Sequence, residues 1–207
     1  MEILDLKKTT QKKAINAAVR VLQQGGVIAF PTETTYGLAC DPRNTKAVKK
    51  IFRIKGRDDG KPLQLIAASR AQVAALATIN APTKKAIAMH WPGALTLLLP
   101  LKKGVRLAAQ VSPKRTIGIR VSSAPLAQSL ARAFGHPIAA TSANRSGNTP
   151  AFSGKGVVDA FHTHPMKPDL LIDAGTIPRN KPSTVAQIAD DGTVEIFRQG
   201  SVRLTST

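Results

Sequence analysis

The spacing of apolar and polar residues divides most of this chain into short helices and strands. Apolar residues that recur every three or four positions predict amphipathic helices, expected at residues 10–24, 44–55, 69–77, 82–90 and 125–134. Short apolar or alternating runs predict strands, expected at residues 27–30, 62–67, 95–99, 116–121, 138–140, 170–172, 183–188 and 193–197. Asp191-Gly192 has the residues of a hairpin turn between the last two strands.

The order of these elements favours an α/β fold without the strict βαβ alternation of a doubly wound sheet. The chain shows no repeats, no low-complexity tail and no obvious linker. We therefore expect residues 1–207 to form a single domain, built on a twisted, open, mixed sheet with flanking helices. Polar side chains follow two of the strands, at Thr32 and Ser142, so these strand ends are expected to line one crevice.

The composition is typical of a globular protein. Of the 207 residues, 43% are hydrophobic, which is enough for a sizeable core. No apolar run is long enough to span a membrane, and the N-terminal residues lack the pattern of a signal peptide. Cys40 is the only cysteine, which excludes an internal disulfide. These features favour a cytoplasmic protein in which Cys40 is a small buried side chain.

Charge is the unusual feature of the composition. The chain has 30 Lys and Arg against 12 Asp and Glu, a net charge of +18. Between Asp59 and Asp159 it has no acidic residue but 13 Lys and Arg. Such a field attracts nucleic acid or nucleotide phosphates, although a solvated basic surface that aids solubility is the alternative. A carboxylate cage for a metal ion is not expected, whereas Mg²⁺ arriving with substrate phosphates is easier to accommodate.

Three places in the chain carry candidate chemistry. Residues 30–38 put three threonine hydroxyls and the Glu33 carboxylate after a buried strand, which fits either a functional loop or a capped turn. Lys55 lies on the apolar side of its helix, so it must snorkel to solvent or meet an anion such as phosphate. Arg120 lies within an alternating strand, either on an open concave face or paired with an anion.

Several common motifs of catalysis and cofactor binding are missing. No Walker-type phosphate loop and no dinucleotide-binding fingerprint occurs in the chain. Ser142 lacks the Gly-x-Ser-x-Gly elbow of a hydrolase nucleophile. His162 and His164 have no further ligands beside them, so a surface loop is favoured over a metal site. We therefore predict neither a covalent intermediate nor a protein-bound metal.

Five short motifs follow one another along the chain: Pro31-Thr32-Glu33-Thr34-Thr35-Tyr36-Gly37-Leu38, Lys55-Gly56-Arg57, Trp91-Pro92-Gly93, Ser142-Ala143-Asn144 and Phe197-Arg198-Gln199-Gly200. Each alone is weak, but in this order they resemble the YrdC-like family of L-threonylcarbamoyl-AMP synthases. That family's signature is Lys-x-Arg followed far downstream by Ser-x-Asn. The resemblance covers nearly the whole chain and is that of the short bacterial type, without a C-terminal extension domain.

The resemblance implies a fold, an activity and partners. The fold is an α/β twisted open sheet around a basic concave cavity. The activity is a nucleotidyl transfer that joins L-threonine, bicarbonate and ATP into threonylcarbamoyl-AMP and pyrophosphate, with Mg²⁺ carried by ATP. Other proteins then transfer the threonylcarbamoyl group to tRNA. The implied partners are therefore these transfer proteins and tRNA or double-stranded RNA, and no membrane.

The resemblance also implies roles for individual residues. Those expected to bind L-threonine are Thr32, Arg120, Ala140 and Ser183, with the Arg120 guanidinium on the substrate carboxylate. Those expected to bind ATP are Lys55, Arg57, Thr116, Ser142, Asn144 and Arg198. The catalytic set is Lys55, Arg57, Ser142 and Asn144, acting by positioning and cationic stabilisation. Ile66 lies near a position where some members have histidine, so no threonine contact is expected there.

A second function stays open on the strength of the charge. An RNA-binding translation or ribosome-maturation factor would use the +18 charge without making an adenylate. It predicts RNA binding that weakens steeply with salt and is indifferent to ATP. Because only 4% of the residues are aromatic, such binding would be electrostatic rather than based on base stacking.

Overall fold

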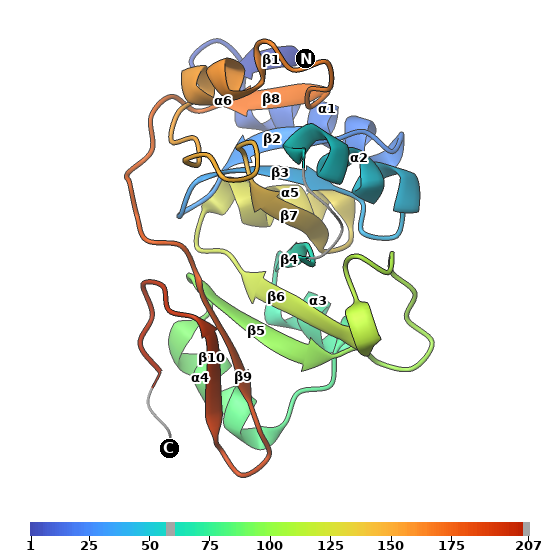
Figure 1. The fold of residues 1–207 in the computed structure, drawn as a ribbon, viewed down its shortest axis with the longest axis vertical. Coiled ribbons are helices and arrows are strands. Elements are labelled where there is room, and N and C mark those ends of the chain that lie inside the picture. The colour runs from blue at the N-terminus through green and yellow to red at the C-terminus, as the bar shows by residue number, and fades with distance from the viewer. Residues whose placement is uncertain (57–60, 205–207) are drawn as a thin grey trace.

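The structure is a computed structural model that describes residues 1–56 and 61–204, and within them ten strands pair into one open, twisted sheet (Figure 1). The sheet follows the long axis of the molecule, so that the N-terminal strand and the C-terminal hairpin lie at opposite ends. In order across the sheet, the strands are β1 (Glu2–Asp5), β8 (Leu170–Asp173), β2 (Ile28–Pro31), β3 (Tyr36–Cys40), β7 (Ile138–Ser142), β4 (Gln64–Ala67), β6 (Thr116–Val121), β5 (Leu95–Pro100), β9 (Thr184–Ile188) and β10 (Val194–Arg198).

Helices cover both faces of this sheet. Helices α1 (Gln11–Gln23) and α5 (Pro125–Phe134) pack on one face and share a hydrophobic cluster with β2, β7 and β8. The other cluster draws on α2 (Thr45–Lys55), α3 (Arg70–Leu76), α4 (Ala81–His90) and α6 (Gly154–Phe161). None of the helices in the described ranges is long and apolar enough to cross a membrane.

Burial on both faces explains why the central strands read as continuous apolar runs. In β2, Ile28 and Phe30 belong to the cluster under α1 and α5, whereas Ala29 between them belongs to the opposite cluster. Since successive side chains of a strand point to opposite faces, a strand covered on both sides needs apolar residues at every position. Parallel and antiparallel pairs are mixed, for example β2 with β8 and β2 with β3. The predicted α/β class and mixed sheet are thus confirmed.

Local capping residues explain where several of the predicted helices begin or end. Ser69 caps α3 by accepting a hydrogen bond from the amide of Gln72 at 3.3 Å. Gly56 ends α2 in the left-handed region, with φ of 59°, and Gly25 follows α1 with φ of 77°. At the last hairpin, the Thr193 amide donates to the Asp191 carboxylate at 2.9 Å, which confirms the predicted turn.

Neither of the strands β1 and β3 nor the helix α6 was predicted from the sequence. The strand β3 runs from Tyr36 to Cys40, directly after the polar turn. In β3, Gly37 faces the carbonyl of Thr141 so closely that an added Cβ would lie 3.3 Å from it. A strand with glycine inside it and a polar turn before it lacks the alternating pattern from which strands are predicted.

Tyr36 fastens β3 to the loop that follows β8. Its side chain is fully buried, and its hydroxyl donates to the Gly175 carbonyl at 2.7 Å. The same hydroxyl accepts a hydrogen bond from the Ala174 amide at 3.0 Å. Burial raises the pKa of the Tyr36 phenol to about 12, and the nearby charge of Asp173 adds to the rise.

We expect Tyr36→Phe to lower the free energy of unfolding near pH 8 by about 1 kcal/mol, because two hydrogen bonds are lost. The difference from the wild type should shrink above pH 10. The folded pKa lies above the ordinary value near 10, so the unfolded state loses its proton first, and the stability due to Tyr36 falls as the pH rises toward 12. Urea unfolding of both proteins from pH 8 to 11 measures this, and a constant difference would contradict the assignment.

Candidate functional site

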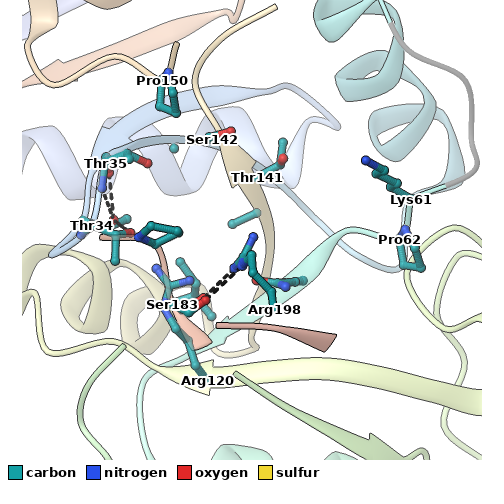
Figure 2. Close-up of a pocket in the computed structure, with 16 residues that line it drawn as sticks. Thr34, Thr35, Lys61, Pro62, Arg120, Thr141, Ser142, Pro150, Ser183 and Arg198 are labelled. Atoms are coloured by element: carbon teal, nitrogen blue, oxygen red, sulfur yellow. Dashed lines mark hydrogen bonds between the residues drawn. The ribbon is translucent and has the colours of Figure 1, made fainter. Parts of the chain in front are cut away.

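A cavity of about 420 Å³ opens on the sheet face that also carries α1 and α5, since Ile66 and Ala140 belong both to its lining and to the core beneath those helices (Figure 2). It extends over β3, β7, β4 and β6, and on one side it is bordered by Pro182, Ser183 and Arg198. The lining consists of Thr32, Thr34, Thr35, Gly37, Lys61, Pro62, Gln64, Ile66, Arg120, Ala140, Thr141, Ser142, Pro150, Pro182, Ser183 and Arg198. Within residues 1–56 and 61–204, the lining includes three basic side chains and no carboxylate.

The turn between β2 and β3 forms one wall of the cavity. The Thr32 hydroxyl organises it by donating to the Thr35 carbonyl at 2.7 Å and accepting from the amides of Thr34 and Thr35 at 3.2 and 3.3 Å. Thr32 is buried, and its hydroxyl also lies 3.0 Å from that of Thr34. Residues 30–38 therefore form a tight hairpin, and the three threonines of its turn line the cavity.

The end of β7 meets Lys55 at a second wall. The Lys55 side chain is only 3% exposed, and its ammonium donates to the carbonyls of Ser142 and Asn144 at 2.7 and 2.9 Å. It also donates to the Asn144 side-chain oxygen at 3.0 Å, which accepts from the Ser142 hydroxyl at 2.6 Å. Lys55 therefore does not snorkel to solvent as one of the two expectations had it. Its ammonium turns inward and holds together the two polar residues of Ser142-Ala143-Asn144.

Two guanidinium groups approach each other at the third wall (Figure 2). Arg198 donates from Nε to the Ser183 carbonyl at 3.0 Å and from Nη2 to the Ser183 hydroxyl at 2.9 Å. Burial lowers the pKa of Arg198, and the charge of Arg120 lowers it further. Two such cations in one cavity favour an anionic ligand between or beside them.

Close packing of the backbone around Gly200 holds Arg198 beside Ser183. A Cβ added to Gly200 would lie 2.1 Å from the Pro182 carbonyl oxygen and 2.5 Å from the Thr184 amide nitrogen. Only glycine allows the chain after β10 to approach residues 182–184 so closely. The glycine of the motif Phe197-Arg198-Gln199-Gly200 therefore has a structural reason, which is to bring Arg198 against Ser183.

The structure brings together most of the residues singled out in the sequence. Those that line the cavity are Thr32, Arg120, Ala140, Ser142, Ser183 and Arg198. Lys55 and Asn144 lie directly behind Ser142 rather than in the lining. Thr116 is also outside the lining, at the start of β6 opposite Pro100, and Arg57 lies outside the described residues.

Some lining residues were not predicted from the sequence. Gln64 lies two positions before Ile66 on β4, so strand alternation could have placed both on the cavity face. Lys61, Pro150 and Pro182 come from loops, and no local pattern distinguishes them from other loop residues. The identity of a lining residue on a loop depends on how distant segments pack.

Neither Cys40 as a nucleophile nor the pair His162 and His164 as metal ligands is supported by the described residues. Burial raises the pKa of the Cys40 thiol, so a reactive thiolate is disfavoured there. The His164 ring nitrogen Nδ1 lies 2.7 Å from the Met166 carbonyl, within its own loop. Within residues 1–56 and 61–204, no three histidine, cysteine or acidic side chains are grouped so that they could hold a metal ion.

Comparison with protein families and curated sequences gives consistent matches. The model of the family Sua5_yciO_yrdC, described as "Telomere recombination", matches residues 20–200. The chain is 38% identical over 196 residues to "Threonylcarbamoyl-AMP synthase" of Bacillus subtilis (strain 168), covering 94% of this chain and 55% of that protein. It is 36% identical over 189 residues to the protein of the same name from Alkalilimnicola ehrlichii, covering 90% of this chain and 97% of that protein. The chain therefore spans about half the length of the first relative and nearly all of the second.

Solved structures share the fold. The crystal structure of P. abyssi Sua5 complexed with L-threonine aligns with a TM-score of 0.86 at 31% identity, covering 97% of this chain and 58% of that chain. The crystal structure of E. coli YciO aligns with a TM-score of 0.80 at 29% identity, covering 96% of this chain and 94% of that chain. Both similarities extend over nearly the whole chain.

Proposed function

This chain belongs to the Sua5/YciO/YrdC family, and from that premise we propose that it is an L-threonylcarbamoyladenylate synthase. The reaction joins L-threonine, bicarbonate and ATP into threonylcarbamoyl-AMP and pyrophosphate. The observation that carries the proposal is the convergence of Thr32, Arg120, Ser183 and Arg198 on one cavity. A relative of known structure, P. abyssi Sua5, binds L-threonine in a fold that covers 97% of this chain.

L-Threonine would occupy the part of the cavity beside Arg120. The guanidinium can receive the substrate carboxylate in two parallel hydrogen bonds, the geometry that arginine favours. The turn at Thr32 and the hydroxyl of Ser183 border the same space, and Ala140 forms part of its floor. The small side chains Gly37 and Ala140 leave room for an amino acid against the sheet.

ATP would lie with its phosphates toward Ser142, Arg198 and Lys61. Threonine's amine first combines with bicarbonate to a carbamate, with loss of one water molecule. A carbamate oxygen then attacks the α-phosphate, and pyrophosphate leaves. Positioning and cationic stabilisation supply the catalysis, without a covalent intermediate. Lys55 and Asn144 would set the position of Ser142, and Lys55 would add its charge. Phosphate contacts by Lys55, Arg57, Thr116 and Asn144 stay predictions.

The magnesium ion is proposed to arrive with ATP. Among the residues that the structure describes, no carboxylate lines the cavity, and Mg²⁺ prefers oxygen ligands such as carboxylates and phosphates. The phosphates of the nucleotide would therefore supply the ligands. We further propose that residues 1–207 act as one YrdC-like domain in the cytoplasm, and that the product passes to proteins that modify tRNA.

A pyrophosphate-release assay tests this function. Purified protein with ATP, Mg²⁺ and bicarbonate is expected to release pyrophosphate only when L-threonine is added, and chromatography should detect the adenylate. Pyrophosphate release that is independent of threonine, or no release at all, would overturn the proposal. If the protein lacks this activity but binds RNA, with an affinity that falls steeply with salt and does not change with ATP, the RNA-binding factor is favoured instead.

A further inference from the structure

Glu33 lies in the turn beside the cavity, and both oxygens of its carboxylate contact the end of β6. Oε1 lies 3.1 Å from Nε of Arg120, and Oε2 accepts a hydrogen bond from the hydroxyl of Ser122. Arg120 and Ser122 are two residues apart, so their side chains leave the chain on the same side. Glu33 itself is not part of the cavity lining.

Three segments of the chain fix Glu33 in this place. The Asn180 side chain donates to the Glu33 carbonyl at 2.8 Å. Ser122 is fully buried, and its hydroxyl also accepts from the amide of Ala124 at 3.2 Å, at the start of α5. The Gln128 side chain donates to the Ser122 carbonyl at 2.7 Å. The partner of the carboxylate is therefore itself held by the loop that leads into α5.

The contact with Glu33 determines which donors of Arg120 face the cavity. An arginine has one N–H on Nε and four on its two terminal nitrogens. Glu33 lies on the Nε side as an ion-pair partner: Oε1 and Nε are 3.1 Å apart without the alignment of a hydrogen bond, and the side chains of Arg120 and Glu33 are only 9% and 14% exposed. Because Arg120 lines the cavity, its terminal nitrogens are the part of the guanidinium left for a ligand there.

The charge of Glu33 also has a role. Arg120 and Arg198 are close enough for the charge of Arg120 to lower the pKa of Arg198. Among the described residues, Glu33 is the one carboxylate in ion-pair contact with Arg120. Without it, two like charges would face each other across the cavity, and Arg120 would gain freedom to move away.

We infer that Glu33 is a positioning residue for recognition of the amino-acid substrate. It holds Arg120 by Nε, so that the two terminal nitrogens present a fixed, bidentate site to the substrate carboxylate. The inference rests on the proposed function and extends it. It assigns to Glu33 an ion pair with Arg120 and no proton transfer to the substrate, because Glu33 is not part of the cavity lining.

A double-mutant cycle tests this role. In the wild-type background, Glu33→Gln is expected to raise KM for L-threonine at least about tenfold, since it removes the negative charge of the buried ion pair that holds Arg120, and to change KM for ATP less than twofold. In the Arg120→Ala background, the same exchange should change KM for L-threonine less than twofold. Equal effects in both backgrounds, or a parallel rise in KM for ATP, would show that Glu33 does not act through Arg120.

Two further variants separate positioning from loss of the fold. Glu2→Gln makes the same chemical change at an exposed residue on β1, at the far edge of the sheet, and serves as the matched control. Should Glu33→Gln fail to fold, Ser122→Ala removes the other contact of the carboxylate and should raise KM for L-threonine alone. Unchanged kinetics in Ser122→Ala would then overturn the inference.

Direct binding distinguishes failure of this inference from failure of the proposed function. If the wild type makes no adenylate but binds L-threonine in calorimetry, the synthase proposal fails. The double-mutant cycle then compares the dissociation constants of L-threonine in place of KM. If the wild type is active and Glu33→Gln equals it, the inference alone fails. If the wild type neither reacts with nor binds L-threonine, both fail.

Discussion

Arg120→Ala is expected to lower kcat/KM for L-threonine by about a hundredfold. Two hydrogen bonds from a guanidinium to a carboxylate contribute about 3 kcal/mol in total, and about 1.4 kcal/mol corresponds to a factor of ten. Most of the loss should fall on KM for L-threonine, because Arg120 would contact the amino acid and not the reacting phosphate. Steady-state pyrophosphate release at varied threonine concentrations measures it.

Arg120→Lys is the informative companion to this exchange. Lysine keeps the charge and can still pair with Glu33, but it cannot form two parallel hydrogen bonds in a plane. We expect it to recover only part of the lost affinity. Complete recovery would mean that the cavity needs a positive charge at this place rather than a bidentate donor. An unchanged KM in Arg120→Ala would remove Arg120 from the threonine site.

Lys55→Ala is expected both to abolish activity and to lower the free energy of unfolding by roughly 3 kcal/mol. The ammonium supplies hydrogen bonds to three oxygen atoms of Ser142 and Asn144, and leaving buried acceptors unpaired costs about 1–3 kcal/mol. The truncated side chain also leaves a space among buried residues, which adds to the loss. Urea unfolding and pyrophosphate release measure the two effects.

Lys49→Ala provides the matched control, since Lys49 is an exposed lysine on the same helix. It should change the free energy of unfolding by less than about 0.5 kcal/mol, as exposed substitutions usually do. Activity must be compared at a temperature at which all variants are folded. If Lys55→Ala were as stable as Lys49→Ala, the buried hydrogen bonds of Lys55 would not contribute to folding.

The sequence predicted the helices better than the strands, for a physical reason. The amphipathic pattern of α2 or α5 is local, because one face meets the core and the other meets solvent. The strand β3 has no such pattern, because β2 and β7 flank it and both of its faces are covered. Its pairing partners come from positions that are far apart in the chain.

The candidate site shows the same division. Hydroxyls at Thr32 and Ser142, an inward-facing lysine and a strand arginine were visible as residue types in unusual places. The contacts between these residues could not be predicted from the sequence. Arg120 and Glu33 are 87 residues apart, and Lys55 contacts residues more than 80 positions later. A single sequence gives no measure of which distant segments pack together.

The sequence by itself therefore determined the class of fold, most helix ends and the residue types of the site, because these depend on local periodicity and local chemistry. The tertiary structure decided which residues share the cavity and which stand behind it. It placed Lys55 behind Ser142 as a support, left Thr116 outside the cavity lining, and paired Glu33 with Arg120. These outcomes depend on how the mixed sheet orders strands from distant parts of the chain, and burial there fixes which polar groups must satisfy one another.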